Sequence, residues 1–137
     1  MDAINISPIS ELPRHIIPIQ CYISGGTFEM YLTDMVQRHG KEICLLLDDL
    51  AWEFSLPCLT GQGTFIDKNL LHEYKEKFGY FFSDKLQTNV IFNKNDFRVI
   101  LFDDKNSLRK KAAIAAQYQI AVYAANHDII KKLRLSD

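Results

Sequence analysis

Short apolar runs, separated by glycine and proline, divide the first third of the chain. Residues 16–23 are rich in isoleucine and are followed by Ser-Gly-Gly at 24–26, which predicts a strand that stops at a tight turn. Apolar side chains then recur every three or four residues, and this spacing predicts a helix over residues 28–39. Thr27 suits the N-cap of this helix, and Gly40 ends it.

The run from Lys41 to Phe54 has two interpretations. Residues 43–47 have the length and composition of a buried parallel strand. The apolar residues of the whole run also fall on one helical face, and leucine beside Asp and Glu is poor strand composition. A strand here predicts an α/β fold, whereas a helix predicts a helical hairpin and an α+β fold. We favour the helix.

The second half of the chain has a clearer pattern. Asp67 can cap a helix that continues to residue 78. Residues 90–92 and 97–102 are apolar and flank the polar segment 93–96, which predicts a β-hairpin. The loop before the helix is marked by Pro57, Gly61 and Gly63.

A long apolar helix is predicted near the C-terminus. Asn106 or Ser107 can cap it, and the segment 112–125 carries no charge, so the helix is expected to reach about residue 126. Apolar side chains occupy two opposite faces of such a helix. One face would pack on the sheet, and the other could meet a second copy of the chain. The predicted interface comprises Tyr118, Val122, Ala125 and Ile129, with the aromatic residues Tyr80, Phe81 and Phe82.

Together these elements predict an α+β fold. Helices would pack on a small mixed or antiparallel sheet in a single compact domain with a long apolar C-terminal helix, and the alternative is an α/β sandwich. The proline-containing residues 1–15 are predicted to form an extended N-terminal arm, and residues 16–137 the globular domain.

Composition narrows the class of protein. The 137 residues contain 16 basic and 17 acidic side chains, a balance that does not favour nucleic acid as a partner. No apolar run approaches the length of a membrane span, and the first 18 residues do not read as a secretory signal. Cys21, Cys44 and Cys58 form no C-x-x-C pair, so we expect reduced thiols and a cytoplasmic location.

Two segments could form a weak anion site. The turn before the first helix offers backbone N–H groups, and basic side chains gather at the start of the last helix, where its dipole is also positive. An ordinary glycine turn and a solvated helix end explain the same residues. The candidate anion-binding residues are Ser24, Gly25, Gly26, Thr27, Ser107, Arg109, Lys110 and Lys111.

Other chemical motifs are weaker still. Asp103, Asp104 and Lys105 superficially match half of a metal-dependent nuclease site, but no convincing second carboxylate follows from the sequence. The four histidines lack metal-ligand spacing, and Cys58 has no evident activating partner. We therefore assign no catalytic residue, metal ligand or cofactor.

The functional hypothesis from the sequence is a non-catalytic protein-binding module of the adaptor, regulator or inhibitor kind. Its partner would be another protein or a second copy of the chain. The alternative is a small enzyme or binder of a phosphate-containing or other anionic ligand.

Overall fold

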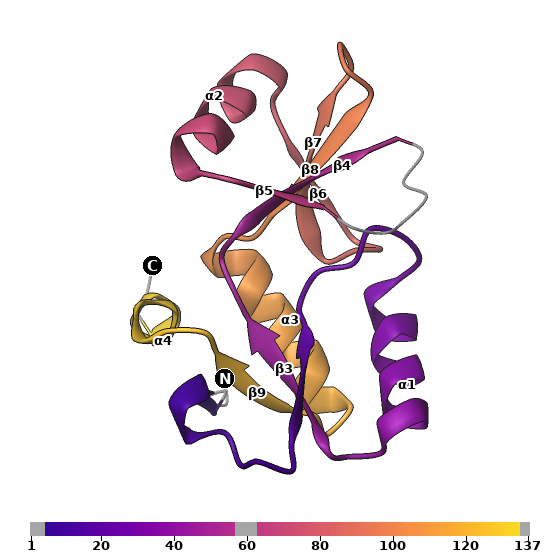
Figure 1. Ribbon diagram of the computed structural model, residues 1–137, viewed down its shortest axis with the longest axis vertical. Helices are drawn as coiled ribbons and strands as arrows, with labels where there is room; N and C mark the ends of the chain where they lie inside the picture. Colours follow the sequence, from indigo (N-terminus) through magenta and orange to yellow (C-terminus); the bar gives the residue numbers. More distant parts are fainter. Residues whose placement is uncertain (1–4, 57–62, 135–137) are drawn as a thin grey trace.

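Two sheets organise the chain (Figure 1). The computed structural model describes residues 5–56 and 63–134, and these combine helices and strands in one domain. The mixed helix and strand content expected from the sequence is confirmed. In the part of the chain that is described, no helix has the length and apolar character needed to cross a membrane.

The lower sheet in Figure 1 is parallel and has four strands in the order β1-β9-β3-β2. Its side chains pack with three helices in one apolar core that includes Leu32, Leu45, Leu108, Val122 and Ile129. The strands are β1 (Ile6–Pro8), β2 (Ile17–Gln20), β3 (Ile43–Leu47) and β9 (Ala121–Ala124), and the helices are α1 (Phe28–His39), α3 (Lys105–Gln117) and α4 (His127–Arg134). A short 3-10 turn, η1 (Ile9–Glu11), follows β1.

The upper sheet is antiparallel and has five strands in the order β5-β4-β8-β7-β6. Helix α2 (Lys68–Phe78) packs on one face, where Leu70, Leu71 and Tyr74 contact Ile91 and Ile100. The strands are β4 (Ala51–Ser55), β5 (Thr64–Ile66), β6 (Phe81–Ser83), β7 (Thr88–Asn93) and β8 (Arg98–Phe102).

The antiparallel sheet is inserted between two neighbouring strands of the parallel sheet. The chain leaves the parallel sheet after β3, forms β4 to β8, and returns through α3 to β9, which pairs directly with β3. Because the departure is from the carboxyl end of β3, the antiparallel sheet lies beyond that end of the parallel strands (Figure 1). The insertion therefore places a second sheet where ligands of parallel α/β sheets usually bind.

The preferred interpretation of residues 41–54 was wrong. They form two strands, β3 and β4, joined by a turn in which the Asp48 carboxylate accepts a hydrogen bond from the backbone N–H of Leu50. Most of β3 is buried because strands flank it on both sides and helices cover one face. A strand buried in this way is nearly all apolar and shows no alternation, so its leucines imitate a helical face.

The long C-terminal helix is also not observed. Helix α3 ends at Gln117, and Gln119 has φ of 60°, a left-handed conformation that stops the helix. The chargeless residues that follow enter β9, between β1 and β3, where both neighbours supply backbone hydrogen bonds. Asp104, not Asn106 or Ser107, caps α3 by accepting from the Ser107 backbone N–H.

The proposed dimer strip consequently does not exist as one surface. Val122 is buried in β9 and Ile129 is fully buried in α4, while Tyr118 follows the end of α3 and Ala125 follows β9. Of the aromatic group, Tyr80 and Phe81 are exposed and Phe82 is half-buried.

Several local predictions are confirmed. Helix α1 spans residues 28–39 with Thr27 as N-cap, and α2 begins after the capping residue Asp67. The β7–β8 hairpin turns at the polar segment predicted for it. Residues 6–8, within the predicted N-terminal arm, pair with β9 as an edge strand. The loop residues Pro57 and Gly61 lie outside the described residues.

Candidate functional site

The carboxyl ends of the parallel strands bring together residues that are distant in sequence. Tyr22 follows β2, Asp48 and Asp49 follow β3, and Asn126 follows β9. Because these strands are parallel, all four residues emerge at the edge that faces the antiparallel sheet (Figure 1). This edge is the usual position of a binding site in a parallel sheet with helical connections.

A group of aromatic rings lies where this edge meets the antiparallel sheet. Tyr22 stacks on Trp52 of β4, with ring centroids 5.3 Å apart and an interplanar angle of 21°. Phe65 of β5 is opposite Trp52 in the strand register and meets it edge-on at 6.2 Å. We call Tyr22, Trp52 and Phe65 the aromatic stack. It lies on the sheet face opposite α2, since the α2 face carries the alternate residues Ala51 and Ile66.

The aromatic stack combines rigid support with access to solvent. Phe54, two residues after Trp52 on the same face, is buried and also contacts Tyr22, with centroids 6.5 Å apart. A Cβ atom on Gly63 would lie 2.8 Å from the Phe54 ring, so the chain packs directly against this ring. Phe65 is 51% exposed, and Tyr22 and Trp52 are partly exposed. The aromatic stack therefore exposes ring surface to solvent, and the buried Phe54 ring supports it from the protein interior.

The Asp48 carboxylate lies near the stack and has altered acidity. Burial raises the pKa of Asp48 above its ordinary value, and the backbone N–H of Leu50 opposes this rise by hydrogen bonding to the carboxylate. Burial is also the main cause that raises the pKa of Tyr22, and the nearby Asp48 carboxylate adds to it. The Tyr22 phenol is therefore a neutral hydrogen-bond donor beside a carboxylate.

A buried ion pair lies beneath the same edge. Lys111 of α3 donates to the Asp103 carboxylate over 2.7 Å, and the Ser107 hydroxyl donates to the other oxygen of Asp103 over 2.7 Å. Desolvation raises the pKa of Asp103, and the Lys111 charge opposes this rise. Burial also raises the pKa of the nearby Cys21 thiol to about 12, so this cysteine is a neutral donor to the Asp48 carbonyl oxygen.

Five of the eight residues predicted to bind an anion have other partners in this structure. In the turn, Thr27 caps α1 by accepting from Met30 N–H, whereas residues 24–26 are exposed. In α3, Arg109 donates to the Leu133 carbonyl oxygen over 2.9 Å, and Lys110 lies 4.2 Å from the Phe82 ring centroid. Ser107 and Lys111 belong to the buried ion-pair cluster. The anion site itself stays a prediction.

The expectation of unpaired thiols is confirmed for two of the three cysteines, whereas the cytoplasmic location stays a prediction. Cys21 and Cys44 are buried free thiols, and Cys58 lies outside the described residues. Within residues 5–56 and 63–134, no group of three or more histidine, cysteine or carboxylate side chains could hold a metal ion.

Sequence reasoning missed the aromatic stack because it favoured a helix over Lys41–Phe54. The strand interpretation contained the necessary signal. In a strand, Trp52 and Phe54 lie on one face and Glu53 on the other, so the sole tryptophan of the chain would have marked an aromatic face. The pairing of Trp52 with Tyr22 and Phe65 depends on contacts between distant segments and had no local signal.

Comparison with known proteins finds similarity in fold only. No known protein family and no curated protein sequence matches the chain. Among solved structures, it is similar to a glycoside hydrolase family 18 N-acetylglucosaminidase from Paenibacillus barengoltzii, with a TM-score of 0.59, 14% identity, and coverage of 87% of this chain and 46% of that one. It is also similar to a chitinase from Chromobacterium violaceum (TM-score 0.56, 12% identity, 88% and 44% covered). A third similar structure is the spore cortex-lytic enzyme SleL from Bacillus megaterium, with a TM-score of 0.54, 12% identity, and coverage of 89% of this chain and 34% of that one.

These similarities correct the hypothesis of a non-catalytic protein-binding module. The three proteins are named as a chitinase, an N-acetylglucosaminidase and a spore cortex-lytic enzyme, all of which are enzymes. The chain spans less than half the length of each, and the low identity shows the fold alone. Its own activity and ligand are therefore a matter for proposal.

Proposed function

We propose that this chain is part of a carbohydrate-active protein of the glycoside hydrolase type and that a saccharide binds on the aromatic stack. The observation that carries the proposal is the stacking of Tyr22, at the carboxyl end of a parallel strand, against Trp52 and Phe65 of the antiparallel sheet. The apolar face of a sugar ring packs on aromatic rings, while polar groups around the site fix its orientation. We also propose that the fold is of the α/β class, which was the alternative interpretation of the sequence.

The polar groups beside the stack suit a saccharide. The Tyr22 hydroxyl is a neutral donor, and Asp48 supplies a carboxylate that accepts from sugar hydroxyl groups. The names of the similar enzymes indicate oligomers of N-acetylglucosamine as the first substrate class to test.

Hydrolysis would assign a further role to Asp48. In most glycoside hydrolases a carboxyl group with a raised pKa donates a proton to the leaving oxygen, and a second carboxylate or, in substrate-assisted families such as family 18, the substrate itself supplies the nucleophile. Burial shifts the pKa of Asp48 in that direction. Asp48 is accordingly our candidate for the proton donor, and the N-acetyl group of an N-acetylglucosamine substrate would act as the internal nucleophile, with water completing the hydrolysis.

A fluorescence titration tests the binding site directly, because Trp52 is the only tryptophan in the chain. Adding the N-acetylglucosamine tetramer should change Trp52 emission in a saturable manner. Phe65→Ala removes a half-exposed ring of the stack and should weaken binding roughly 5- to 10-fold. The matched control is Tyr80→Ala, since Tyr80 is 55% exposed but contacts Phe102 on the α2 face. Tyr80→Ala should leave the affinity unchanged.

Product analysis tests the hydrolytic step. If the full chain releases shorter saccharides from the tetramer, Asp48→Asn should abolish release while the fluorescence titration still shows binding. An unchanged rate in Asp48→Asn would remove Asp48 from the reaction. Absence of any Trp52 response to the tetramer at millimolar concentration would contradict the saccharide site itself.

A further inference from the structure

A cavity lies on the opposite side of the antiparallel sheet from the aromatic stack. Its volume is about 470 Å³, and its walls come from α2, the start of α3, the end of β8, α4 and the turn after β3. Phe102, which belongs to the core under α2, forms part of the wall and identifies the face of the sheet involved. The cavity and the aromatic stack are therefore separate sites.

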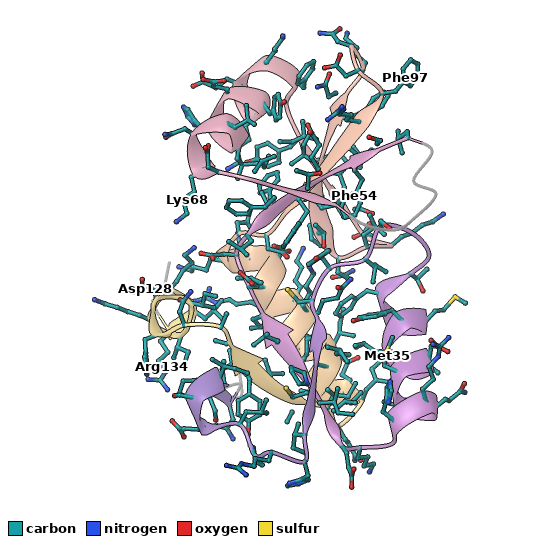
Figure 2. All side chains as sticks on the ribbon, in the orientation of Figure 1. Met35, Phe54, Lys68, Phe97, Asp128 and Arg134 are labelled. Atoms are coloured by element: carbon teal, nitrogen blue, oxygen red, sulfur yellow. The ribbon has the colours of Figure 1, made fainter. Side chains whose placement is uncertain are left out.

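Basic side chains from three helices converge on this cavity. Lys68 and Lys75 come from α2, Lys105 from α3 and Lys132 from α4, and His72 of α2 lies between the first two. Figure 2 shows the Lys68 side chain at the start of α2 directed toward α4. Because these helices are distant in sequence, no local charge run accounts for the convergence.

The three carboxylates in the wall are already engaged with the protein. Asp103 is 3% exposed and bonded to the fully buried Lys111, and Asp104 caps α3. Asp49 lies 3.4 Å from the Lys132 ammonium. The Lys111–Asp103 pair is neutral, so Lys68, Lys75 and Lys132 face the carboxylates of Asp49 and Asp104. The potential in the cavity is consequently positive and attracts an anion.

Apolar surface in the wall indicates that the ligand is larger than a bare ion. Leu71 and the Phe102 ring line the cavity, and the Lys75 ammonium lies 4.6 Å from the Phe102 ring centroid. A volume of about 470 Å³ is within the usual range for small-molecule sites. It accommodates a molecule of the size of a sugar bearing a phosphate or carboxylate.

We propose that this cavity binds a small anionic molecule through a phosphate or carboxylate group held by Lys68 and Lys132, with its less polar part against Leu71 and Phe102. Lysine suits this role because its ammonium group is a mobile point charge with three donors. The site differs in position and ligand charge from the proposed saccharide site, so each can fail without the other.

Calorimetric titration of the full chain at constant ionic strength tests the site with four probes: glucose 6-phosphate, glucuronate, inorganic phosphate and glucose. Glucose 6-phosphate, glucuronate or both should bind, and glucose should not. Tighter binding of the phosphate ester than of the carboxylate identifies phosphate as the recognised group, and the reverse order identifies carboxylate. Binding of inorganic phosphate as tightly as glucose 6-phosphate would overturn the role of the apolar wall.

Two variants with the same change in net charge distinguish binding in the cavity from attraction of the anion by the net charge of the protein. Lys68→Glu should weaken binding of the preferred probe about tenfold or more, because it places a carboxylate at the mouth of the cavity. Lys94→Glu makes the same change in net charge at the exposed β7–β8 turn and should have no effect. Equal losses in both variants, or no binding of either anionic sugar by the native chain at 10 mM, would overturn the proposal. Amide chemical-shift changes in the native chain, expected near Lys68 and Lys132, provide a reading that depends on no variant.

Discussion

Replacing Lys111 by methionine should strongly destabilise the fold. The substitution keeps the unbranched apolar part of the side chain and removes the ammonium that lies 2.7 Å from the Asp103 carboxylate. Lys111 is 0% exposed and Asp103 is 3% exposed, so water cannot replace the lost partner. Asp103 keeps only the Ser107 hydroxyl as a strong donor. Breaking such a buried pair costs about 3–5 kcal/mol of unfolding free energy.

The double variant Lys111→Met with Asp103→Asn isolates the cause. It removes both charges, while the amide oxygen introduced at position 103 can still accept from the Ser107 hydroxyl, so most of the lost stability should return. Urea unfolding followed by circular dichroism measures the free energy of unfolding of the native chain and both variants, and thermal unfolding measures their Tm. For a domain of this size, the single substitution should lower Tm by roughly 10–20 °C.

The pH dependence has a definite sign. The pKa of Asp103 is raised in the folded chain, and loss of Lys111 raises it further. A raised carboxyl pKa means that stability decreases as pH rises from the unfolded value through the folded one. The deficit of Lys111→Met should therefore shrink as pH falls from 7 toward 4. A loss below 1 kcal/mol at pH 7, or a deficit that grows at lower pH, would refute the reasoning.

Three further outcomes follow from packing. Gly63→Ala should cost about 1–3 kcal/mol, because its Cβ would lie 2.8 Å from the buried Phe54 ring, whereas Gly25→Ala, with no atom within 4 Å, should change stability by less than about 0.5 kcal/mol in urea unfolding. Val122→Arg should unfold the chain as judged by circular dichroism, since Val122 is buried in β9; a soluble folded variant would contradict this placement. Cys21 should resist alkylation of the native chain at pH 8, as measured by peptide mass mapping, because burial raises its thiol pKa to about 12; rapid modification would contradict its burial.

The sequence alone was enough to predict the helices and turns whose ends carry capping residues, glycine or polar turn residues. Helices α1 and α2 have Thr27 and Asp67 as N-caps and a glycine with positive φ after the last turn, so their boundaries depend on residues within a few positions. The β7–β8 hairpin likewise depends on its own polar turn. Such features are determined by short-range hydrogen bonding and backbone sterics, which a single sequence displays.

The strands β3 and β9 show what only the tertiary structure decided. Residues 43–47 and 121–124 carry apolar or small side chains that fit a helix or a buried strand equally well, and their strand conformation is stabilised by hydrogen bonds between segments as distant in sequence as Cys44 and Ala121. The same long-range pairing brings Tyr22 against Trp52 and gathers lysines from three helices around one cavity. Caps and turns act locally and were predictable, whereas parallel pairing, with the sites it creates, is a property of the folded chain.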